Sequence, residues 1–207
     1  MTISKILGFS QLQNYLEDEK NRFGCFVDTS ILFSETYPLD VFNEEAVNAF
    51  NILVDMAVPI FTNVNVRAEF LENHRRVLIA ECLIDILEEP DLNFDGILHE
   101  KLKSHRTSYR RKIAEEKSAK MELSQIKMFR KLLLSQKSRH GNAWELFCRN
   151  YLYSKLEPIW GQAENELGLN VISLRSQDQS SYLNKIPDWG DDVRALNTYR
   201  DALSTFT

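Results

Sequence analysis

Two short apolar runs, each ending in polar residues, constrain the fold of this sequence more than any other feature. Residues 23–27 end at Asp28, and residues 58–62 end in a threonine. Neither run alternates apolar and polar side chains, which is typical of strands buried on both faces of a parallel sheet. Between them, Asn43 resembles a helix N-cap, and apolar residues follow at helical spacing as far as Ala57. We therefore predict a β-α-β unit with a right-handed crossover.

The rest of the chain continues the alternation of helices and strands. Residues 65–89 place apolar side chains along one helical stripe, and Gly168 precedes a third strand candidate at 169–174. Residues 91–167 between them are predicted to be a long, mostly helical and partly basic insertion. The predicted fold class is α/β, with a small parallel sheet, in a single domain over residues 1–207.

Composition excludes several classes of protein. Of the 207 residues, 43% are hydrophobic, which is enough for a buried core, and the seven glycines form no phosphate-binding loop of the Walker or dinucleotide type. No apolar run approaches the roughly 20 residues that span a bilayer, so we expect a soluble, cytoplasmic protein without a membrane partner.

The three widely spaced cysteines indicate reduced, buried thiols rather than a zinc site, which needs closely spaced ligands. They are Cys25, Cys82 and Cys148.

Charge is unevenly distributed along the chain. The net charge is −5, yet the segment from His99 to His140 holds thirteen Lys or Arg against four Asp or Glu. A solvated helical face explains such a segment, and contact with phosphates is the alternative. The candidate nucleic-acid contacts are Arg106, Arg110, Arg111 and Lys112.

Candidate site residues lie where the predicted strands end. Because parallel strands place their carboxyl ends at one edge of the sheet, Asp28 and Glu69 would converge there if the two strands are neighbours. Two close carboxylates hold a hard cation, and oxygen-only ligation suits Mg²⁺ or Mn²⁺. Alternatively, Asp28 caps the next helix and Glu69 is an ordinary carboxylate on the helix flank. Glu72 is expected to face solvent and to pair with Arg76.

The sequence around these carboxylates resembles a known family. Residues 26–32, Phe-Val-Asp-Thr-Ser-Ile-Leu, and residues 58–69 are similar to the first two strands of a PIN domain and to the helix that bears its glutamate. The resemblance implies a PIN-type sheet and a ribonuclease dependent on Mg²⁺ or Mn²⁺, with RNA as partner. It leaves open a protein inhibitor or antitoxin and a homo-oligomer. The implied metal ligands are Asp28 and Glu69, with Thr29, Ser30 and Thr62 close to them.

The resemblance fails late in the chain, where PIN domains supply further acidic residues. Asp191 and Asp192 are the substitutes that this sequence offers, and surface or capping roles are the alternative for both. We therefore expect either truncation after Thr207 or a degenerate domain, with weak or absent cleavage. A phosphatase of the haloacid dehalogenase type would need a second aspartate where Ser30 stands. The other readings are a non-catalytic RNA- or protein-binding module on the same fold and a purely helical interaction module.

Overall fold

The computed structural model describes residues 11–88, 94, 96–138 and 141–172, and the structural statements below concern these residues. By its internal contacts the chain divides into two units, Met1–Val171 and Ile172–Thr207. Nearly all described residues belong to the first unit. Within the described ranges, no helix is both long and apolar enough to cross a membrane.

A small parallel sheet forms at the three predicted places. Its strands are β1 (Cys25–Phe26), β2 (Ile60–Asn63) and β5 (Leu169–Ile172), in the order β1-β2-β5. Strands β1 and β2 pair in parallel, and the amides of Cys25 and Val27 donate to the carbonyls of Pro59 and Phe61 at 2.8 and 2.9 Å. The predicted α/β class with a small parallel sheet is therefore confirmed, within a chain that is mostly helical.

Strand β1 differs from the prediction in length and in burial. Only two residues have strand geometry, and Phe23 and Phe26 are 80% and 55% exposed, whereas Val27 is buried. The prediction that this strand is buried on both faces was wrong. Phe23 precedes the strand, and Phe26 alternates with Val27, so its side chain points away from the core.

Helices make up most of the remaining described chain. They are α1 (Leu12–Leu16), η2 (Glu19–Asn21), α2 (Thr29–Thr36), α3 (Asn43–Asp55), α4 (Val64–Asp85), η3 (Ile86–Glu88), α5 (Gly96–Ala114), α6 (Leu123–Ser135), α7 (Ala143–Phe147), the π-helical turn η4 (Cys148–Leu152) and α8 (Tyr153–Glu166). A short antiparallel pair, β3 (Lys137–Ser138) and β4 (Gly141–Asn142), lies between α6 and α7. The helix predicted at 65–89 is thus α4 with the 3₁₀ turn η3.

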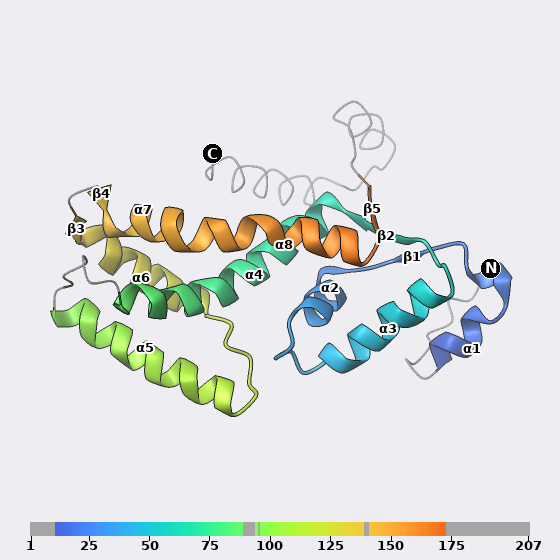
Figure 1. Ribbon diagram of the computed structural model, residues 1–207, viewed down its shortest axis with the longest axis horizontal. Coiled ribbons are helices and arrows are strands. Elements are labelled where there is room, and N and C mark those ends of the chain that lie inside the picture. The colour runs from blue at the N-terminus through green and yellow to red at the C-terminus, as the bar shows by residue number, and fades with distance from the viewer. Residues whose placement is uncertain (1–10, 89–93, 95, 139–140, 173–207) are drawn as a thin grey trace, which may run out of the picture. The chain divides into compact units, whose positions relative to one another are not determined.

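Buried apolar side chains of the described residues form two clusters, and α4 contributes to both. In the sheet core, Val66 and Phe70 of α4 pack with side chains of β2, α2, α3 and α8. In the helical core, Ile79 and Leu83 of α4 pack with α5, α6, α7 and η4. Figure 1 shows α4 continuing from the end of β2 and running beside α8. Helix α8 reaches the sheet core as well, where Trp160 meets Phe70 with ring centroids 5.5 Å apart.

Two local predictions about helix surfaces were wrong. Asn43 does not cap α3. It is the first helical residue, and its side-chain Nδ2 donates to the carbonyls of Ser34 and Glu35 at 2.7 and 3.0 Å. The acceptor at this helix start is the Asp40 carboxylate, which takes the amide of Phe42 at 3.0 Å.

Glu72 pairs with Arg75, three residues on, through two contacts of 2.7 Å, and not with Arg76 as predicted. Arg76 instead donates to the carbonyl of Met121 at 2.8 Å. A backbone acceptor from a distant segment therefore outcompetes the local ion pair, which on an exposed helix is worth only about 0.3–0.5 kcal/mol.

The three cysteines are unpaired, as expected. Cys82 and Cys148 are buried, whereas Cys25 is half-buried. Burial raises the pKa of Cys82 to about 12 and that of Cys148 to about 11. Both thiols therefore stay protonated near neutral pH and serve as packing groups in the helical core.

Helix α3 ends in a Schellman motif built on a residue other than glycine. The amide of Val58 donates to the carbonyl of Leu53 at 2.9 Å, and that of Ala57 donates to Val54 at 3.0 Å. Leu53 and Val58 are both buried in the sheet core and supply the apolar contact of this motif. Ala57 adopts φ of 53°, a left-handed conformation that costs an L-residue about 1–2 kcal/mol.

Replacing Ala57 with glycine is expected to stabilise the protein by about 0.5–1 kcal/mol, because the strain lost exceeds the added entropy of the unfolded chain. Ala49, inside the same helix, is the matched control, and Ala49→Gly should destabilise by about 1 kcal/mol. Urea unfolding of both variants measures the two changes. Destabilisation by Ala57→Gly would contradict the proposed strain.

Candidate functional site

The parallel pairing of β1 and β2 places two helix starts at the same edge of the sheet. Asp28 follows β1 and caps α2, with its Oδ1 accepting from the amide of Thr29 at 2.7 Å. Asn63 ends β2 and caps α4, with its Oδ1 accepting from the amides of Asn65 and Val66 at 2.9 and 3.0 Å. The two helices therefore start from neighbouring points, as strands paired in parallel require.

A hydrogen bond joins α2 to the predicted site residue Glu69. The buried hydroxyl of Thr29 donates to Oε2 of Glu69, in the second turn of α4, at 2.7 Å. Thr29 is also the residue whose amide bonds to Asp28, so one residue contacts both carboxylates. The structure thus brings Asp28 and Glu69 to the same edge of the sheet, where both bond to Thr29. The capping role that we weighed for Asp28 is also present.

A second contact holds the same two helices together two turns further along α2. The hydroxyl of Thr36 donates to the carbonyl of Leu32 at 3.0 Å and lies 2.8 Å from Nε2 of His74 on α4. The tautomer of His74 sets which of the two groups donates in the second contact. The imidazole is buried between the rings of Phe33 and Phe70, at centroid distances of 5.1 and 4.5 Å.

The remaining predicted site residues are placed differently. Ser30 is exposed, and its hydroxyl lies 3.4 Å from Oδ2 of Asp28. Thr62 is wholly buried, with its hydroxyl 3.5 Å from the carbonyl of Val27, so it faces the neighbouring strand. Asp191 and Asp192 lie outside the described residues. Among the residues described, no group of three or more His, Cys, Asp or Glu is placed to hold a metal ion.

The candidate nucleic-acid contacts lie on α5 and differ in exposure. Arg110 and Arg111 are exposed, whereas Arg106 and Lys112 are half-buried. Arg111 and Lys112 stand in the last turn of the helix, where positive charge also complements the helix dipole. Lys101 and Lys103 of α5 are also exposed.

His74 and Thr36 are functional neighbours that the sequence analysis did not single out. His74 follows Phe70 by four residues and so lies on the buried stripe of α4, which was a usable signal. Its partner on α2 is 38 residues away in sequence, and nothing local indicates that contact.

Comparison of the chain with protein families, curated proteins and solved structures finds no match. The class of the protein therefore rests on its own fold and site. It is a mostly helical α/β protein with two carboxylates and a threonine at the carboxyl edge of a small parallel sheet.

Replacing Thr29 with valine, which has nearly the same shape, is expected to destabilise the protein by about 2 kcal/mol, because Glu69 loses a charge-assisted hydrogen bond. Thr29→Ser keeps the hydroxyl and should retain most of the stability. Urea unfolding of the two variants at neutral pH compares them. Equal stability of the serine and valine variants would show that the bond to Glu69 contributes little.

The contact between Thr36 and His74 predicts that the stability of the protein depends on pH. Burial, with a smaller contribution from Lys120, lowers the pKa of His74 to about 4. Above pH 6.5 the ring is neutral in both states, whereas between pH 6.5 and 4 the unfolded chain binds a proton that the folded chain does not. The free energy of unfolding should therefore fall as the pH falls through this window, by about 3 kcal/mol in total.

His74→Gln is the matched control for this effect, since the glutamine amide can donate to or accept from Thr36 but does not titrate. Urea unfolding from pH 7.5 to 4 should show a smaller loss of stability for the glutamine variant than for the parent protein. Parallel curves for the two proteins would contradict the assignment of the pH dependence to His74.

Proposed function

We propose that this protein is a PIN-like ribonuclease that uses Mg²⁺ or Mn²⁺ to hydrolyse phosphodiester bonds of RNA. The observation that supports the proposal is the pair of carboxylates, Asp28 and Glu69, which come from different elements and both accept a hydrogen bond from Thr29. The resemblance of residues 26–32 and 58–69 to the PIN family supports it independently.

The donor set suits a hard divalent cation. Only oxygen atoms are offered, which favours Mg²⁺ or Mn²⁺ over softer metals. Oδ1 of Asp28 accepts the capping amide at 2.7 Å, whereas Oδ2 has only the longer 3.4 Å contact with the Ser30 hydroxyl, so Oδ2 is the ligand atom in this proposal. Thr29 orients the Glu69 carboxylate. When bound, such an ion would lower the pKa of a water for in-line attack and offset charge on the phosphate. Asp191 and Asp192 are proposed to complete the ligands.

The basic surface of α5 supplies the attraction that an acidic site needs for an RNA substrate. The proposal assigns Arg106, Arg110, Arg111 and Lys112 to RNA phosphates, and the cytoplasm as the place of action. Arg110 and Arg111 are the exposed members of this set. A protein inhibitor and self-association are the further partners that the proposal admits.

A non-catalytic RNA- or protein-binding module on the same fold is the second candidate function. It is favoured by the fact that the described residues offer two carboxylates at the site and no third metal ligand. In that case the acidic pair has a structural role, and α5 provides the binding surface.

Asp28→Asn and Glu69→Gln are each expected to reduce Mn²⁺-dependent cleavage of a single-stranded RNA by at least about 100-fold, because each removes a metal ligand. Glu72→Gln on the same helix is the control and should cleave normally, since Glu72 pairs with Arg75. Cleavage is followed on denaturing gels, with and without EDTA.

The same variants separate the two candidate functions. The protein is a non-catalytic binding module if two results hold. RNA binds in EDTA with unchanged affinity in all three variants, and neither the parent protein nor any variant cleaves RNA in Mn²⁺. Cleavage that survives in both Asp28→Asn and Glu69→Gln would place the reaction elsewhere.

A further inference from the structure

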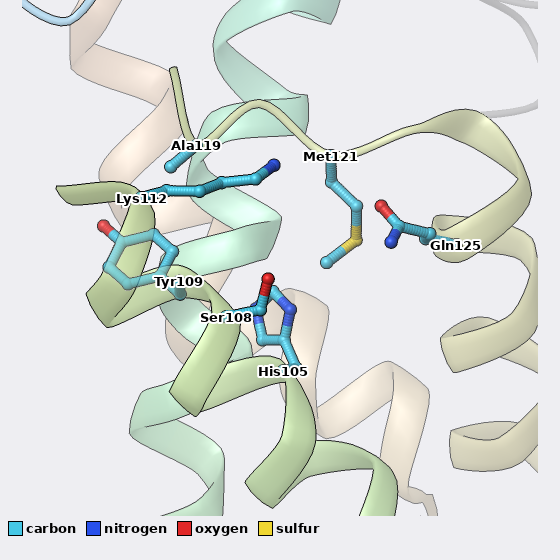
Figure 2. Close-up of a pocket in the computed structure, with 7 residues that line it drawn as sticks. All are labelled: His105, Ser108, Tyr109, Lys112, Ala119, Met121 and Gln125. Atoms are coloured by element: carbon cyan, nitrogen blue, oxygen red, sulfur yellow. The ribbon is translucent and has the colours of Figure 1, made fainter. Parts of the chain in front are cut away.

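A small polar cavity lies between α5 and the segment that leads into α6. It is lined by seven residues and has a volume of about 30 Å³. Figure 2 shows their side chains arranged around the opening. The lining residues are His105, Ser108, Tyr109, Lys112, Ala119, Met121 and Gln125. We call this cavity the α5–α6 pocket.

Backbone hydrogen bonds fix the shape of the α5–α6 pocket. Helix α5 ends in a Schellman motif, in which the amide of Lys117 donates to the carbonyl of Lys112 at 2.8 Å, and Glu116 adopts φ of 52°. The chain then turns back along the helix. The amide of Ala119 donates to the hydroxyl of Tyr37 at 2.9 Å, and that of Met121 donates to the carbonyl of Arg76 at 3.2 Å.

His105 fixes the base of the pocket. Its Nε2 lies 2.7 Å from the carbonyl of Ala80 on α4 and must be the donor, since a carbonyl only accepts. The ring also packs against Phe129 of α6, edge to face, at a centroid distance of 5.6 Å. Burial lowers the pKa of His105, so the ring is uncharged near neutral pH. Lys112 is then the one formally charged side chain of the lining.

The pocket presents hydrogen-bond donors. Within the described part of the chain, the ammonium of Lys112 has no carboxylate partner and the hydroxyl of Ser108 makes no side-chain bond, and no acidic residue lines the pocket. The Oε1 of Gln125 accepts from the amide of Glu122 at 3.2 Å, which leaves its NH₂ group as a donor. Figure 2 shows Lys112, Ser108 and Gln125 around the same opening.

We propose that the α5–α6 pocket binds the oxygen atoms of a phosphoryl group. A cation with two neutral donors and no carboxylate in the lining favours an oxyanion. A volume of 30 Å³ is about what two waters need, and so it fits two phosphoryl oxygens rather than a whole ligand. Two ligands carry such phosphoryl oxygens, an RNA phosphodiester and free phosphate. The pocket shares Lys112 with the proposed RNA contact, but it does not depend on cleavage at Asp28 and Glu69.

The test is an amide NMR titration of the whole chain with inorganic phosphate at low ionic strength. Phosphate should shift the resonances of residues 105–125 in a saturable way. Ser108→Ala should weaken binding about tenfold, the expected effect of losing one charge-assisted hydrogen bond. Lys112→Met should weaken it further. Lys103→Met removes an equal charge from an exposed position of α5 outside the pocket and should change affinity less than about twofold.

A second arm, with a short homouridine RNA in EDTA, distinguishes the two sources without any cleavage. Competition between RNA and phosphate, with RNA binding weakened by Ser108→Ala, supports the pocket and assigns it to the RNA backbone. Phosphate binding without competition supports the pocket and assigns it to free phosphate. Phosphate that shifts no pocket resonance, or equal losses in Lys112→Met and Lys103→Met, overturns the proposal whether or not the protein cleaves RNA.

Discussion

The architecture depends on one helix that is shared by two hydrophobic cores. Helix α4 has 22 residues, a length of about 33 Å at 1.5 Å per residue. Its first turns place Val66 and Phe70 in the sheet core, and its later turns place Ile79 and Leu83 in the helical core. Because α4 starts directly after β2, the sheet edge and the helical region are held by a single rigid element. Lys155 of α8 reinforces this link through Glu81 and Asp85 of α4, at 2.6 and 3.1 Å.

The candidate site uses the same interactions that build the fold. Asp28 satisfies an amide at the start of α2, and Thr29 places its hydroxyl on Glu69. The contact between Thr36 and His74 then fixes the other end of α2 against α4. Two contacts, one near each end of α2, therefore hold it against α4. A structural role and a chemical role for these residues are therefore compatible.

Local sequence patterns were sufficient to predict features that depend on residues close together in the chain. The places of the three strands, the helix over 65–89 and the position of the two carboxylates at the sheet edge follow from apolar patterning and from the rule for parallel strands. The errors arose where a distant segment supplied the partner. Asn43 bonds to the end of α2 instead of capping α3, and Arg76 bonds to Met121 instead of Glu72. Phe26 is exposed because it points to the face opposite the buried Val27, and only the packing of the assembled protein decides which face is covered.

The sequence alone determined the α/β class, the place of each strand in the chain and the acidic and basic residue types that suggest phosphodiester chemistry. Periodicity and turn residues are encoded within a few positions of one another, so they can be recognised without a structure. Only the tertiary structure decided that Thr29 joins the two carboxylates and that His105, Ser108, Lys112 and Gln125 surround one cavity. These contacts cross between elements, and their geometry is set by how the helices pack, which no local pattern specifies.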